Sequence, residues 1–70
     1  MNIFAKRLKE LRLDRNLMQK DVADCIGITP QQYQRYEYGK QEPTLSKLTA
    51  LADFYKISID ELVGRKIPEN

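Results

Sequence analysis

Four side chains near the middle of the chain could hydrogen-bond to the edges of nucleic-acid bases. A glutamine amide can pair with N6 and N7 of adenine, and an arginine guanidinium can pair with O6 and N7 of guanine. The four side chains are those of Gln31, Gln32, Gln34 and Arg35. They can act together only on one exposed surface, so the elements that position them decide their chemistry.

A short helix that ends in a sharp turn is expected before these residues. Its range is 19–25, and its apolar positions are Val22, Ala23 and Ile26. The small side chain of Ala23 lets a neighbouring helix approach closely. Gly27 can adopt the left-handed conformation that ends helices, so the chain can reverse there.

A second helix is expected over residues 30–38. Thr29 is a suitable capping residue, Pro30 suits the first helical position, and Tyr33 and Tyr36 would face the core. Two helices of this length joined by a turn of three or four residues predict a helix-turn-helix whose second helix has one free face. The alternative is a helical hairpin whose polar face is only solvated.

The residue Gln32 has two possible uses. It is the third residue of the expected helix, where its side chain could complete a capping box with Thr29. It could instead point outward to a ligand, and both alternatives stay open.

The remaining segments also have helical periodicity, which predicts an all-α domain of five helices. A first helix follows the capping residue Asn2 and runs to about Asp14. Its apolar stripe consists of Phe4, Leu8 and Leu11. The apolar stripe expected for the fourth helix consists of Leu45, Leu48, Leu51, Ala52 and Tyr55.

Capping residues mark the starts of the last two helices. Thr44 precedes the fourth, and Ser58 with Glu61 forms a capping box before a short fifth helix. Gly64 ends the fifth helix.

The chain is expected to form one small domain followed by a tail. Its 70 residues suffice for one compact core. We expect a single domain over 1–64, with the two crossing helices at 19–38, and a flexible C-terminal tail at 65–70.

The charge of the chain is mildly positive and unevenly distributed. Twelve Lys and Arg against ten Asp and Glu give a net charge of +2. Residues 1–40 hold eight basic and five acidic side chains, whereas residues 41–70 hold four and five. The basic excess suits a polyanionic partner, and an ordinary solvated surface explains it about equally well.

Composition argues against several function classes. The chain has no His and one Cys, so we expect no enzyme, no metal site and no cofactor. The uncharged stretch 25–34 is too short and polar to span a membrane, and the charges at 6–10 leave no apolar signal core. We therefore expect a soluble, cytoplasmic protein without membrane contact.

Two segments resemble the helix-turn-helix of the Cro and lambda-repressor-like family. They are LMQKDVADCIGI at 17–28 and YEYGKQEP at 36–43, and the resemblance extends over about 4–64. The family comprises bacterial and phage transcriptional regulators of the xenobiotic-response-element type. The resemblance implies a compact five-helix DNA-binding domain whose third helix lies in the major groove. It also implies that a homodimer binds a palindromic operator in double-stranded DNA.

The resemblance also implies roles for individual residues. Gln31 would be the leading base reader, Arg35 the next, and Gln32 and Gln34 secondary ones. The expected phosphate contacts are Gln19, Lys20, Tyr38, Lys40 and Arg12. Arg12 would in addition form a partly buried ion pair with Glu37, which is the interpretation we favour for this pair.

Three residues depart from the family pattern. Met18 stands where a capping Ser or Thr is usual, so the helix at 19–25 should lack a side-chain cap. Pro30 has no polar group for a base. Tyr33 is larger than the expected aliphatic residue, and its hydroxyl should reach water or a partner.

The expected function is a sequence-specific transcriptional regulator, by preference a repressor. A rival is a module that uses the same fold to hold a protein partner, such as a toxin. An apolar cluster of Phe54, Val63 and Ile67 could serve the homodimer, or it could pack against the first helix.

Overall fold

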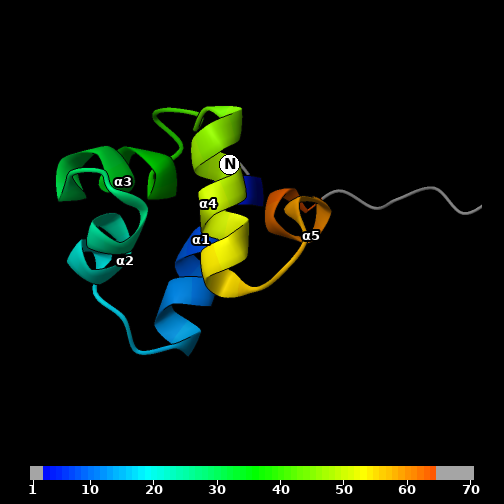
Figure 1. Cartoon of the computed structure of the whole chain (residues 1–70), viewed down its shortest axis with the longest axis horizontal. Coiled ribbons are helices and arrows are strands. Elements are labelled where there is room, and N and C mark those ends of the chain that lie inside the picture. The colour runs from blue at the N-terminus through cyan, green and yellow to red at the C-terminus, as the bar shows by residue number, and fades with distance from the viewer. Residues whose placement is uncertain (1–2, 65–70) are drawn as a thin grey trace, which may run out of the picture.

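Five helices make up the part of the chain that the computed structural model describes, residues 3–64, and no strand occurs there (Figure 1). The all-α, five-helix prediction is confirmed. The helices are α1 (Ile3–Asp14), α2 (Gln19–Ile26), α3 (Pro30–Glu37), α4 (Leu45–Tyr55) and α5 (Ile59–Val63). The expected cap at Asn2 and the expected tail at 65–70 lie outside the described residues.

The turn and capping residues of the α2–α3 unit occupy the positions expected from the sequence. Gly27 ends α2 in the left-handed conformation, with a φ of 75°. The hydroxyl of Thr29 accepts a hydrogen bond from the backbone N–H of Gln32 at 3.1 Å, and Pro30 begins α3. Tyr38 is the C-cap of α3, so the helix ends one residue before the expected boundary.

The starts of the other helices differ in their capping. Thr44 caps α4 through the backbone N–H of Lys47, and Ser58 forms a capping box with Glu61 at α5. Met18 provides no side-chain cap for α2, as expected. The carboxylate of Asp21 partly compensates, because it accepts a hydrogen bond from the backbone N–H of Met18 at 2.9 Å.

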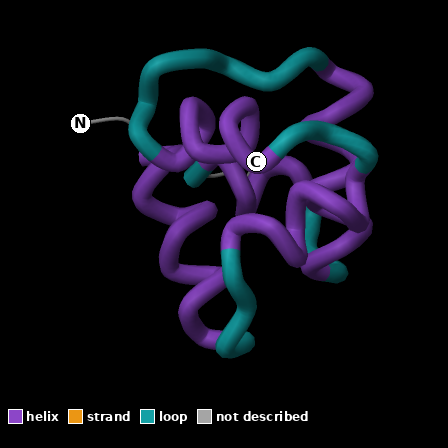
Figure 2. The backbone as a smooth tube through the Cα atoms, turned by 90° about the vertical axis from the view of Figure 1, so that its left-hand side faces the viewer, coloured by secondary structure: helices purple, strands orange, loops and turns teal. Residues whose placement is uncertain are grey.

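The core draws side chains from all five helices. α3 packs against α2 and α1, while α4 lies between the α2–α3 pair and α5 (Figure 1). The connection between α3 and α4 is the longest loop among the described residues (Figure 2). The fully buried large side chains are Tyr33, Tyr36, Tyr55, Leu8, Leu51, Leu62 and Val22.

The expected apolar stripe of α4 is wrong at its first position. Leu45 is 73% exposed, whereas Leu51, Ala52 and Tyr55 are buried. Leu45 is the first residue of α4, so its side chain projects beyond the part of the helix that the core covers. Periodicity assigns a residue to a helix face but does not say where along the helix the core ends.

Phe54 and Val63 are partly buried and pack against the core. Ile67, the third member of the expected apolar cluster, lies outside the described residues. The strongly exposed apolar side chains include Ile3 as well as Leu45. Among residues 3–64, no helix has the length and apolar character needed to cross a membrane.

A capping substitution at Met18 should stabilise the domain. Met18→Thr supplies a hydroxyl to the first turn of α2, and little packing is lost because Met18 is 64% exposed. We expect the free energy of unfolding, measured by urea denaturation, to rise by about 0.5–1 kcal/mol. Met18→Ala is the matched control, since it removes the same side chain without adding a cap. Equal stabilities of the two variants would contradict this prediction.

Candidate nucleic-acid interface

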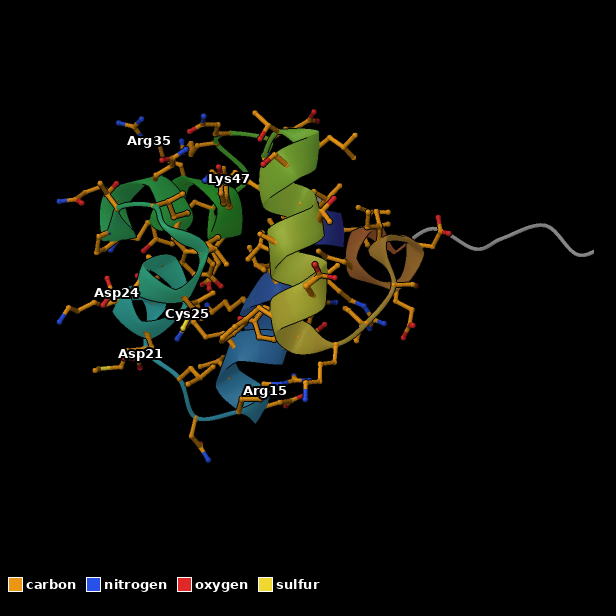
Figure 3. The ribbon with its side chains drawn as sticks, in the orientation of Figure 1. Arg15, Asp21, Asp24, Cys25, Arg35 and Lys47 are labelled. Carbon is orange, nitrogen blue, oxygen red and sulfur yellow. The ribbon has the colours of Figure 1, made fainter. Side chains whose placement is uncertain are left out.

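One face of α3 is turned to solvent and carries polar and aromatic side chains. Gln31, Arg35 and Tyr38 are exposed and follow one another at intervals of four and three residues, so they share one side of the helix. Arg35 points away from the other helices (Figure 3). The opposite side of α3 is anchored by Tyr33 and Tyr36, which are fully buried or nearly so. The outer face therefore belongs to a helix that the core holds firmly.

The two flanks of this face carry the secondary candidates. Gln32 and Gln34 are half-buried. The side-chain Nε2 of Gln32 donates a hydrogen bond to the hydroxyl of Tyr36 at 3.1 Å. The capping-box alternative for Gln32 is therefore wrong, because its amide binds Tyr36 one turn later instead of the backbone of Thr29.

The first turn of α2 lies beside α3, as the contact between Gln19 and Glu37 shows. Lys20 is exposed there. Gln19 is the first residue of α2, where backbone N–H groups have no acceptor within the helix and favour an anion. Its side-chain Nε2 donates to Oε1 of Glu37 at 3.3 Å, so one amide hydrogen of Gln19 is directed toward α3.

An ion pair joins α1 to α3. Arg12 Nε lies 2.6 Å from Oε2 of Glu37, and Arg12 Nη2 donates to Oε1 at 3.1 Å. Arg12 Nη1 donates to the carbonyl of Leu17 at 2.9 Å. The side chain of Glu37 is 1% exposed and that of Arg12 is 11% exposed, so both charges are largely withdrawn from water.

The surroundings fix the charge states of this pair. Burial acts to raise the pKa of Glu37, but the interactions of its carboxylate with Arg12, the Tyr33 hydroxyl and Gln19 outweigh burial and hold that pKa below its ordinary value. Hydrogen bonding to Glu37 raises the pKa of Arg12. Both groups are therefore ionised at neutral pH, and the bidentate geometry is the strong form of such a contact.

Two buried tyrosine hydroxyls lie beside this pair. The hydroxyls of Tyr33 and Tyr55 are buried and lie close to each other and to the Glu37 carboxylate, without a hydrogen bond of good geometry. Burial raises the pKa of Tyr33, and the nearby Glu37 carboxylate raises it further, so the hydroxyl stays neutral. Tyr33 is fully buried, so its hydroxyl does not reach water, and the groups that act on it are the Glu37 carboxylate and the Tyr55 hydroxyl.

The loop after α3 places further polar groups next to the outer face. Tyr38 is 63% exposed, and Lys40 is exposed as well. The backbone N–H of Lys40 donates to the carbonyl of Arg35 at 2.8 Å, which fixes the loop on the end of α3. Within residues 3–64 no group of three or more possible metal ligands occurs.

Sequence reasoning missed two side-chain contacts at this surface. The Gln32–Tyr36 contact had a signal, since residues four apart are neighbours on a helix. The Gln19–Glu37 contact joins two helices, and no local pattern announces it.

Comparisons with known proteins support the helix-turn-helix arrangement of the chain. A family model described as helix-turn-helix matches residues 8–62. The transcriptional repressor RstR of the cryptic phage CTXphi from Vibrio cholerae is 41% identical over 62 residues, which are 89% of this chain and 56% of that protein. The chain thus spans about half the length of the curated relatives it matches.

Two solved structures are similar to the whole domain. A transcriptional regulator from Listeria innocua has a TM-score of 0.88 at 30% identity, with 100% of this chain and 64% of that chain covered. The P22 c2 repressor in complex with a synthetic operator has a TM-score of 0.86, with 94% of this chain and 100% of that chain covered. Its identity is 20%, so this second likeness concerns the fold alone.

Removal of the Glu37 charge should destabilise the domain in a pH-dependent way. Glu37→Gln leaves Arg12 without its counter-charge, and we expect a loss of roughly 3–5 kcal/mol in the free energy of unfolding at pH 7. Because the pKa of Glu37 is lower in the folded state, its contribution is present above the ordinary value of 4.5 and is lost as pH falls through the folded-state pKa.

The measurement is urea unfolding of both proteins from pH 7 down to pH 3. The difference between wild type and Glu37→Gln should shrink below pH 4.5. Glu42→Gln, at an exposed position, is the matched control and should behave like wild type. A difference that is constant over this pH range would contradict the assigned ionisation of Glu37.

Proposed function

The chain belongs to the helix-turn-helix family of Cro/C1-type regulators, and from this premise we propose that it binds double-stranded DNA sequence-specifically and regulates transcription. The single observation that carries the proposal is the outer face of α3. It presents Gln31 and Arg35 to solvent, while Tyr33 and Tyr36 fix the opposite side in the core. A helix of this kind fits the major groove and brings side chains to base edges.

Base recognition is assigned to the outer face and its flanks. Gln31 lies in the first turn of α3, and the N-terminal residues of a recognition helix are those that meet base edges. Arg35 extends the contact by one turn. Gln34 and Gln32 are placed at the edges of the contact, because both are half-buried on the flanks.

Phosphate contacts are assigned to groups on both sides of α3. On one side, Gln19 and Lys20 lie in the first turn of α2, where free backbone N–H groups favour an anion. On the other side, Tyr38 and Lys40 are exposed after α3. Arg12 uses one hydrogen of each terminal nitrogen for Leu17 and Glu37, so the second hydrogens serve the phosphate contact.

We infer that the protein acts as a homodimer on a palindromic operator. The exposed apolar side chains of Ile3 and Leu45 support this, because a symmetric contact with a second copy would bury them. A groove lined by Phe4, Glu42, Pro43, Leu48 and Val63 offers a further, largely apolar surface for such a contact. Repression is the mode we propose, since occupancy of an operator is sufficient for it, and RstR is named a transcriptional repressor.

Lys40→Ala should weaken binding to all DNA sequences alike. The lost contact is to phosphate, so the slope of log K against log salt should flatten by about one unit. Fluorescence anisotropy with a labelled duplex at several salt concentrations measures this slope. Lys56→Ala is the matched control, because Lys56 is also exposed but lies at the C-terminal end of α4. A changed base preference with an unchanged slope would contradict the phosphate assignment of Lys40.

Gln31→Ala should change which base is preferred at one position of each half-site. The amide pairs with base edges, and its loss should cost roughly 1–3 kcal/mol of discrimination at that position. Sequencing of the duplexes retained from a randomised pool by variant and wild type measures the preference. If the variant loses affinity uniformly and keeps every base preference, Gln31 is not a base reader.

A further inference from the structure

The hydrogen bond between Gln32 and Tyr36 places a constraint on the flank of α3. Nε2 of Gln32 donates to the hydroxyl of Tyr36 at 3.1 Å, and the two residues lie one turn apart. The ring of Tyr36 is 1% exposed, so the core fixes where its hydroxyl can be. Gln32 is half-buried and forms the boundary between that core and the solvent.

This contact leaves a specific pair of groups on Gln32 free. A glutamine amide has two N–H hydrogens and one carbonyl oxygen, and Tyr36 takes one of the hydrogens. The oxygen and the second hydrogen remain as one acceptor beside one donor. Adenine presents the matching donor and acceptor at N6 and N7, whereas guanine presents two acceptors at O6 and N7.

The contact also restricts the side-chain conformations of Gln32 before DNA binds. A glutamine side chain without such a contact would lose this conformational freedom only on binding. Immobilising a long side chain at an interface costs roughly 0.5–1.5 kcal/mol. Because Tyr36 already holds the amide of Gln32 in the free protein, most of this cost does not arise when DNA binds. Gln32 lies in the first turn of α3, beside Gln31, so it is positioned for the same groove.

We propose that the hydroxyl of Tyr36 is a positioning group for base recognition: it holds the Gln32 amide so that Gln32 selects adenine at one position of the half-site. The proposal rests on the proposed function, since it requires α3 to read DNA. It raises Gln32 from a peripheral contact to a determinant of specificity. It also gives a buried tyrosine a role that its packing alone does not require.

The test is competitive binding to duplexes in which each base pair of the wild-type preferred sequence is replaced in turn. Gln32→Ala should lose the preference for adenine at one position and identify that position. Tyr36→Phe should reduce the same preference by roughly 2- to 10-fold, the factor that corresponds to the cost of immobilising the side chain. It should leave the position that depends on Gln31 unchanged.

Tyr55→Phe is the matched control. It removes another buried tyrosine hydroxyl, one that belongs to α4 instead of α3. We expect this variant to keep all base preferences, and melting curves of both tyrosine variants show whether each is folded. A loss of adenine preference in Tyr36→Phe that Tyr55→Phe does not share supports the positioning role, whereas equal losses in both overturn it.

Gln32→Glu gives a second readout that does not alter Tyr36. The carboxylate has no N–H and presents only acceptors, so the preference should pass from adenine to cytosine, whose N4 is a donor. An unchanged preference at this position overturns the proposal. So does a Gln32→Ala variant that binds every duplex more weakly by the same factor, which would indicate a phosphate contact.

The results separate this proposal from the function on which it rests. If wild type has base preferences and Gln32→Ala keeps all of them, the proposed role of Gln32 and Tyr36 is wrong. Sequence-specific DNA binding by α3 is then still supported. If wild type binds every duplex equally, sequence-specific recognition itself fails, and the positioning role fails with it.

Discussion

The orientation of α3 depends on one buried carboxylate. Glu37 lies near the end of that helix, is 1% exposed and accepts hydrogen bonds from Arg12 on α1 and Gln19 on α2. Arg12 in turn donates to the carbonyl of Leu17, in the connection between those two helices. Three segments that are distant in sequence therefore meet at a single charge. A buried charge tolerates no loss of its partners, so their relative positions are strongly constrained.

This constraint explains how a small domain can present an outer face with a defined geometry. The side chains of Gln31 and Arg35 are exposed, so they do not hold α3 in place. The position of this outer face follows from the contacts on the opposite side of the helix. Behind it are the Glu37 contacts and the rings of Tyr33 and Tyr36. This arrangement has an energetic cost, because the Tyr33 hydroxyl is buried beside the carboxylate without a hydrogen bond of good geometry.

Local patterns predicted the fold well because they act over one or two turns. Thr29, Ser58 and Gly27 each fix a helix end through contacts within a few residues, and the helices begin or end where these residues predict. The outward direction of Gln31 and Arg35 also followed from helical spacing. Such features need no knowledge of the tertiary structure.

The features that sequence could not supply depend on where distant segments meet. Leu45 has the periodicity of a core residue, yet the core ends before it. The Tyr33 hydroxyl was expected to reach water or a partner, and close packing keeps it from water and beside the Glu37 carboxylate. Gln19 was assigned to phosphate from its place at a helix start, but its amide also contacts Glu37, a partner eighteen residues away. Each of these outcomes is set by packing between helices, which spacing within a helix does not describe.

Selection of duplexes by the wild-type protein from a randomised pool tests most directly whether α3 reads DNA sequence. At about 150 mM salt, where exposed charges are substantially screened, the retained duplexes are sequenced. We predict enrichment of a palindrome whose half-site centres lie about one helical turn apart, as a symmetric pair of α3 helices requires. Retention without any enriched sequence, which disappears as the salt concentration rises, would contradict sequence-specific recognition and leave only attraction to phosphate.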